Sequence, residues 1–145
     1  MSEYKTVLAT TDFSDAAAAG VTEAIKLARA LGAELALLYV AEDRMPPLTF
    51  STEAQRAEIQ RHHETMARKS LDEYAAKHLD GLQAKTLLRR GHPAPEIVAC
   101  AKEIGADIIV MATHGYGSVG QMVFGSTMRR VLAHAGCPVV AVHSR

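Results

Sequence analysis

The sequence has 145 residues, 48% of them hydrophobic, which suits one domain large enough to bury a core. Its 16 basic side chains balance 16 acidic ones, so charge gives no reason to expect binding to nucleic acid or to acidic membranes. No apolar run approaches the roughly 18 residues of a membrane span, and no signal peptide is visible. Two cysteines outside any C-x-x-C pair fit a reducing compartment, so we expect a cytoplasmic protein.

Apolar strands alternate with amphipathic helices along the whole sequence. Because no linker or low-complexity tract interrupts them, we expect residues 1–145 to form a single α/β domain, a doubly wound parallel sheet with helices on both faces. The expected strands are 4–10, 34–40, 82–90, 108–112 and 139–142. The expected helices are 16–31, 51–79, 95–104 and 126–135, and the segment 41–50, with Pro46-Pro47, is expected to be an irregular flap.

Capping residues mark the helix ends. Ser14 or Asp15 is available as the N-cap of the first helix, and Ser126 as the N-cap of the last. The last helix carries an apolar stripe, and so, more thinly, does the long helix 51–79, which should lie on the surface and bury one face. The two stripes are Met128, Val131, Leu132 and Ala135, and Ile59, Met66, Leu71, Tyr74 and Ala75.

A glycine-rich loop, Thr113-His-Gly-Tyr-Gly-Ser-Val-Gly120, follows the strand 108–112, and Gly125-Ser126-Thr127 then opens the last helix. Glycines let bare backbone approach a ligand, and the free N–H groups at a helix start attract anions. The loop lacks the lysine of a P-loop. Its literal G-x-G-x-x-G match is weak, because the helix begins later and no acidic residue follows at the required distance. The segment therefore predicts an anion site of another type.

The spacing His114-Gly115, nine residues, then Gly125-Ser126 resembles the nucleotide-binding loop of the universal stress protein family. ATP-binding members of that family carry G-x-x-G, nine residues, then G-S or G-T. Ala112 stands where the family has its first glycine, a change that adds one methyl group. The resemblance covers nearly the whole chain and implies the adenine nucleotide alpha hydrolase-like fold, with five strands in the order 3-2-1-4-5. Strands one and four then flank the crevice where such sheets bind ligands.

The resemblance also implies which residues contact the adenosine part of a nucleotide. Thr11 and Asp12 belong to the turn on the adenosine side. The backbone of Val40 reads the adenine edge, and Met111 and Ala112 lie beside the ribose. Asp12 has a second interpretation, as a cap of the first helix, and the two roles are compatible.

The phosphates are expected at the other end of the crevice. By the resemblance, Gly115, Gly125, Ser126 and Thr127 hold them through backbone and hydroxyl donors, while His114 either contacts phosphate or braces the loop. The implied ligand is ATP, and Mg²⁺ or Mn²⁺ could bridge phosphates and water without a protein carboxylate. No cluster of metal ligands is visible in the sequence.

Catalysis is not the favoured interpretation. Phosphoryl transfer needs positioned cations and a metal carboxylate, whereas residues 115–125 hold no lysine or arginine and neither cysteine has a visible activating neighbour. We therefore expect an ATP-binding universal stress protein, a stress-response or signalling module read by an unidentified protein partner, with little or no turnover and no catalytic residue. Two alternatives stay open: a slow ATP hydrolase or autophosphorylating protein on the same fold, and a structural dimer whose glycine loop binds no nucleotide.

The last strand, Val139 to Val142, is apolar and expected at one edge of the sheet. Such edges tend to be covered or paired. The resemblance implies that two copies pair their last strands in antiparallel fashion across a two-fold axis, the commonest oligomer symmetry. The sequence therefore predicts a homodimer.

Overall fold

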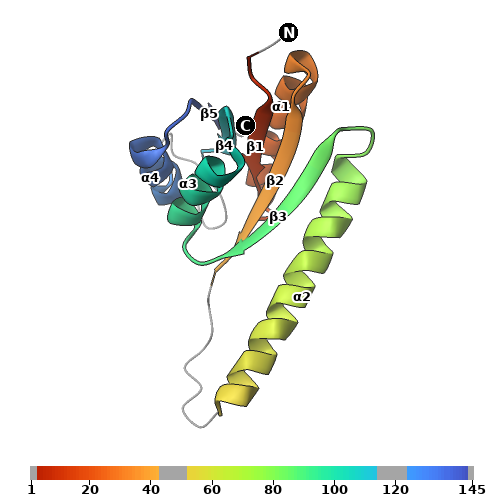
Figure 1. The fold of residues 1–145 in the computed structure, drawn as a ribbon, viewed down its shortest axis with the longest axis vertical. Helices are drawn as coiled ribbons and strands as arrows, with labels where there is room; N and C mark the ends of the chain where they lie inside the picture. Colours follow the sequence, from red (N-terminus) through yellow and green to blue (C-terminus); the bar gives the residue numbers. More distant parts are fainter. Residues whose placement is uncertain (1–2, 43–51, 114–123, 144–145) are drawn as a thin grey trace.

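The structure is a computed structural model that describes residues 3–42, 52–113 and 124–143 (Figure 1). The proline-containing segment expected to form a flap and most of the glycine loop lie outside the described residues. The strands are β1 Thr6–Thr10, β2 Glu34–Ala41, β3 Ala84–Arg90, β4 Ile108–Ala112 and β5 Val139–Val142. The helices are α1 Asp15–Leu31, α2 Glu53–His78, α3 Pro93–Ile104 and α4 Ser126–His134.

All five strands run parallel in the order β3-β2-β1-β4-β5, which confirms the predicted sheet. The core has two halves, one on each face. Val7 and Leu37 face the half covered by α1 and α2, while Leu8 and Leu38 face the half covered by α3 and α4. Because helices cover both faces, the central strands are apolar without alternation.

The winding direction reverses between β1 and β4. From β1 the chain builds outward through β2 to β3, and it then returns to place β4 on the other side of β1 and β5 beyond it. Ligands of open parallel sheets bind outside the carboxyl ends of the strands at such a switch point. The fold therefore opens its crevice at Thr10 and Ala112, where β1 and β4 end.

Helix α2 buries less of itself than its apolar stripe predicts. Leu71 is its one fully buried residue among those described, and Met66 is 47% exposed. Figure 1 shows that the N-terminal end of α2 projects beyond the carboxyl ends of β2 and β3, so its first turns have no sheet to pack against. Thr52 caps this projecting end in a reciprocal capping box with Gln55.

Two further expectations about α4 are wrong. Leu132 is 44% exposed rather than part of the buried stripe, whereas Met128 and Val131 are buried. The N-cap of α4 is Gly125, not Ser126, which is the first helical residue. Ser14, one of the two candidates, caps α1, and α1 and α3 end as predicted, before Gly32 and Gly105 in the left-handed conformation. By contrast, α3 begins at Pro93 rather than at residue 95, and α2 is Glu53–His78 rather than 51–79.

Candidate functional site

A pocket of about 560 Å³ lies at the switch point, within the size range of small-molecule sites. The carboxyl ends of β1, β2 and β4 and the first turns of α3 and α4 line it. Eight of the ten residues predicted for the site are brought together there: Thr11, Asp12, Val40, Met111, Ala112, Gly125, Ser126 and Thr127. The other two, His114 and Gly115, lie outside the described residues.

Nine more residues line the pocket and escaped the sequence analysis: Thr10, Ala17, Leu38, Tyr39, Glu42, Pro93, Ile97, Thr113 and Met128. Most of them are neighbours of predicted positions, and they could have been included by extending each strand end by one or two residues. Pro93 and Ile97 are different, because only the packing of α3 against the sheet brings them to the crevice.

The turn between β1 and α1 is closed by its own hydrogen bonds. The Asp12 carboxylate accepts a hydrogen bond from the Ser14 amide at 2.9 Å and another from the Ser14 hydroxyl. That hydroxyl in turn accepts from the amide of Ala17 at 3.1 Å and so caps α1. Asp12 therefore fixes the capping residue instead of capping the helix itself, and it does so while lining the pocket.

The start of α4 is built differently. Gly125 forms no side-chain cap, and the first turn of α4 holds no acidic residue. By contrast, α1 has Ser14 and Asp15, and α2 has a capping box and Glu53. The amide of Gly125 donates to the Thr113 carbonyl at 2.9 Å, but helix geometry gives the next three amides no acceptor within α4. Those amides and the helix dipole suit an anion.

Thr113 ties the end of β4 to two other elements. Its amide donates to the Val142 carbonyl of β5 at 2.9 Å, and its carbonyl accepts from Gly125. Its hydroxyl lies 3.3 Å from Nδ1 of His143. Thr113 is buried, so these bonds hold the start of α4 at a fixed place beside β4.

Gly20 of α1 is a determinant of the crevice that the sequence analysis missed. A Cβ atom there would lie 2.8 Å from the Ala112 amide nitrogen and 3.1 Å from the Met111 carbonyl carbon. Helix α1 thus touches the backbone of β4 where β4 enters the pocket. The available signal was a glycine inside a helix, which costs about 1 kcal/mol relative to alanine and calls for a packing reason.

The described lining of the pocket offers hydroxyls, main-chain amides and two carboxylates, Asp12 and Glu42, but no lysine, arginine or histidine. No group of three metal-ligating side chains occurs within residues 3–42, 52–113 and 124–143. Burial raises the pKa of the Cys100 thiol, which Arg89 only partly offsets, and burial also raises the pKa of Cys137. Neither thiol is activated as a nucleophile.

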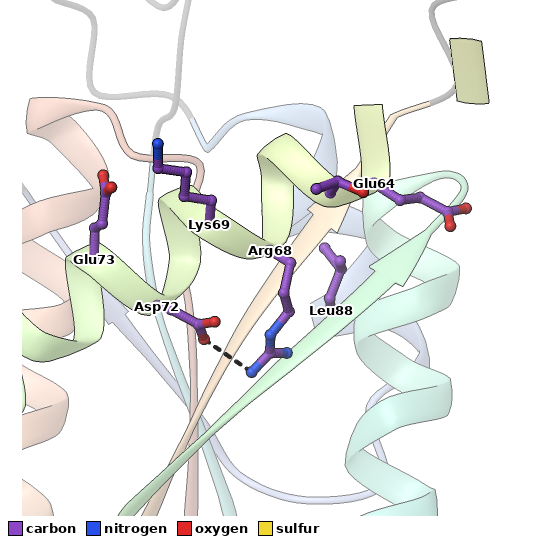
Figure 2. A pocket seen from close by; sticks show the side chains of 7 residues that line it. Glu64, Arg68, Lys69, Asp72, Glu73 and Leu88 are labelled. Carbon is purple, nitrogen blue, oxygen red and sulfur yellow. Dashed lines mark ion pairs between the residues drawn. The ribbon is translucent and has the colours of Figure 1, made fainter. Parts of the chain in front are cut away.

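A second hollow, of about 620 Å³, runs along α2 beside β3 (Figure 2). Charged side chains of α2 line it, and Leu88 comes from β3. Arg68 is paired with Asp72 at 3.0 Å, the contact drawn in Figure 2, and Arg68 also bonds Thr86. None of the predicted site residues lies here, so the crevice at the switch point is the candidate site.

The sheet order and the position of the pocket define the class: a doubly wound α/β protein of the adenine nucleotide alpha hydrolase-like fold. The model of the universal stress protein family matches residues 3–143, and the chain therefore belongs to this family. No helix in the described part of the chain has the length and apolar character needed to cross a bilayer.

Three relatives show the extent of the similarity. A universal stress protein of Thermus aquaticus, from the 3′ region of the QAH/OAS sulfhydrylase, is 34% identical over 96% of this chain and 98% of its own. The solved structure of MJ0577 from Methanocaldococcus jannaschii has a TM-score of 0.77 at 28% identity, covering 98% of this chain and 97% of its own. A universal stress protein from Archaeoglobus fulgidus, solved in complex with dAMP, shares the fold at 22% identity, with a TM-score of 0.63 and coverage of 98% and 99%.

Proposed function

We propose that this chain binds ATP at the switch-point pocket and acts as a nucleotide-dependent stress-response or signalling module in the cytoplasm. One observation carries the proposal: a single pocket gathers the adenosine-side residues Thr11, Asp12 and Val40 and the uncapped start of α4 at Gly125. In a bound nucleotide the base would lie along the end of β2, the ribose between Asp12 and β4, and the phosphates at the amides that open α4. The Archaeoglobus fulgidus relative, which binds dAMP, supports an adenine nucleotide as the ligand class.

Binding without efficient turnover is the favoured form of this function. The described lining brings no cationic side chain to the phosphate end, where developing charge would need stabilisation. A Mg²⁺ or Mn²⁺ ion fits the site as a partner of the phosphates and water rather than of a protein cage, since the described lining supplies only Asp12 and Glu42 as charged oxygen ligands. The alternative, a slow ATP hydrolase, predicts metal-dependent release of phosphate.

The test is to identify by mass spectrometry what the purified chain carries, and then to melt the emptied protein with ATP, ADP, AMP and GTP. A ligand present at one hundred times its Kd stabilises the folded state by about 2.7 kcal/mol. We expect ATP to do so and GTP to do so less. If no adenine nucleotide copurifies and none raises the melting temperature, the proposal is wrong and the structural-dimer alternative is favoured.

A homodimer is the second part of the proposal, and the position of β5 supports it. β5 is an edge strand of the sheet. Its Ala141 is exposed and its three valines are half-buried. The Pro138 carbonyl accepts a bond from the Ile109 amide of β4, and the Val142 carbonyl accepts one from the Thr113 amide just beyond β4. Because strand residues alternate in direction, the amides of Val139 and Ala141 face away from β4, toward the open edge. A second copy could pair there and bury both edges.

Ala141→Pro tests this arrangement. The change removes an amide that faces away from β4 and leaves the bonds to β4 intact. Proline is accepted at such a position only in an edge strand. Sedimentation at low micromolar concentration should give a dimer for the wild type and a monomer for the variant. A wild-type monomer, or a variant that stays dimeric, would exclude pairing through β5.

A further inference from the structure

The turn that carries Asp12 is strained. Phe13 has φ of 66°, and it is the one non-glycine residue in the described ranges with a positive φ. A bulky side chain rarely adopts this left-handed conformation, which persists only where the surroundings enforce it. Because Phe13 directly follows Asp12 in the turn, whatever holds Phe13 also sets the direction of the carboxylate.

Two aromatic side chains hold Phe13. Its ring lies against Tyr39 of β2, with centroids 4.6 Å apart and planes at 50°, and against Tyr74 of α2, at 5.6 Å and 60°. His78 backs the second ring at 4.3 Å. Such tilted arrangements are favourable for aromatic pairs. Phe13 is therefore held both by β2, which lines the pocket, and by α2, which does not.

Tyr74 reaches the turn at a second point. Its phenol lies close to Thr11, whose hydroxyl accepts the Phe13 amide at 3.0 Å. The pKa of Tyr74 is raised, mainly by burial and further by the nearby Asp12 carboxylate, while the Thr11 side chain opposes the rise. Ring and hydroxyl therefore act together on the residues that flank Asp12.

We propose that Tyr74 is a positioning residue for the adenosine end of the pocket: from α2 it holds Phe13 in its left-handed conformation and thereby aims the Asp12 carboxylate. This inference rests on the proposed nucleotide site.

The test is a double-mutant cycle with ATP and inorganic tripolyphosphate as probes. Tyr74→Ala should weaken ATP binding about tenfold, as Asp12→Ala does, because a loosened turn no longer aims the carboxylate whose charged hydrogen bond to the nucleotide is removed outright in Asp12→Ala. The double variant should be no weaker than Asp12→Ala alone, since the two act through one interaction. Tripolyphosphate binding should be unchanged, and Tyr74→Phe, which keeps the ring, should retain most of the affinity.

Leu71→Ala is the matched control. It removes a buried side chain of the same helix one turn earlier and should lower the melting temperature while leaving the ATP affinity unchanged. Additive losses in the cycle, an equal loss in Leu71→Ala, or an equal loss of tripolyphosphate binding would each overturn the proposal. Should Tyr74→Ala fail to fold, Tyr74→Leu carries the same predictions.

Hydrogen exchange separates this inference from the proposed function. The amides of Phe13 and Ser14 are bonded within the turn, to Thr11 and Asp12. Without any nucleotide, Tyr74→Ala should speed their exchange at least about tenfold and Leu71→Ala should not. If the wild type binds no ATP, the proposed function fails and this measurement alone decides on the positioning role, with unchanged exchange in Tyr74→Ala overturning it.

Discussion

The two ends of the pocket satisfy their polar groups in opposite ways. At the β1–α1 turn, Asp12 and Ser14 bond one another and Ser14 caps its helix. At the start of α4, Gly125 supplies no side-chain cap and no acid follows in the first turn. The first end is complete without a ligand, whereas the second leaves amides that an anion would satisfy. The β1–α1 turn is pre-organised, and the start of α4 has amides that favour an anion. This combination suits a ligand with a rigid head and an anionic tail.

The largest effect is expected from a side chain added at the start of α4, where the phosphates are proposed to bind. Gly125 has φ of −63°, and a Cβ there would lie 3.3 Å from the Thr113 carbonyl oxygen, so a side chain is tight but allowed. Gly125→Val should fold and lose the whole stabilisation of about 2.7 kcal/mol that ATP at one hundred times Kd gives the wild type. Thermal melting with and without ATP measures it.

Gly136→Val is the control for that experiment. Gly136 lies just beyond the other end of α4, and a Cβ there would meet nothing within 4 Å. The same side chain at this place should leave the ATP response intact. A full ATP response in Gly125→Val would mean that the phosphates do not lie at the start of α4.

Gly20→Ala tests the contact between α1 and β4, which lies between the two ends of the pocket. The added methyl group would lie 2.8 Å from the Ala112 amide nitrogen, closer than real contacts allow, so α1 or β4 must shift. Overpacking of this kind costs roughly 1–3 kcal/mol, of which the better helix propensity of alanine returns up to about 1. Urea denaturation should show a lower midpoint for Gly20→Ala than for the wild type. Gly136→Ala, whose added methyl group lies in open space, should keep the wild-type midpoint. An unchanged midpoint in Gly20→Ala would indicate that the close approach is not constraining.

A pair of serine variants probes the comparison directly. Ser14→Ala removes the cap of α1 and should cost the empty protein about 1 kcal/mol of stability. Ser126→Ala removes no cap and should leave the empty protein as stable as the wild type, yet weaken its response to ATP. Denaturant curves with and without ATP separate the two patterns. Loss of stability in empty Ser126→Ala would show that its hydroxyl supports the helix after all.

Local patterns were enough to predict the elements, because each strand and helix buries a continuous or periodic set of side chains. The run 108–112 has no alternation because helices cover both of its faces, and that burial is what the structure shows. Strand order was different. Periodicity indicates a parallel α/β sheet, but the order 3-2-1-4-5 came from the resemblance to the universal stress protein family, since no local pattern says which strands are neighbours.

What could not be predicted depends on contacts between distant segments. The spacing of Met66 fits a buried stripe, yet its side chain is 47% exposed, although its neighbours Glu64 and Arg68 reach Arg90 and Thr86 of β3. The cap of α4 moved by one residue, from Ser126 to Gly125, which changes a side-chain cap into a backbone one. The grip of Tyr74 on Phe13 joins residues 61 positions apart in the chain, and neither side chain carries a sequence signal for it.

The smallest expected effect concerns alkaline pH at the adenosine end. The pKa of Tyr74 is raised above its usual 10.0, so below pH 10 the folded and unfolded states hold this proton equally and the contribution to stability is fully present. As the pH rises above 10, the unfolded tyrosine ionises first, and stability is lost until the folded residue ionises as well. Because the side chain is half-buried and solvent screens the charges, we expect only a small loss. Urea midpoints at pH 9 and above 10 should fall less in Tyr74→Phe than in the wild type, while Tyr4→Phe, at an exposed site, should follow the wild type. An equal fall in Tyr74→Phe would mean that the hydroxyl is already solvated and that α2 holds the turn through the ring alone.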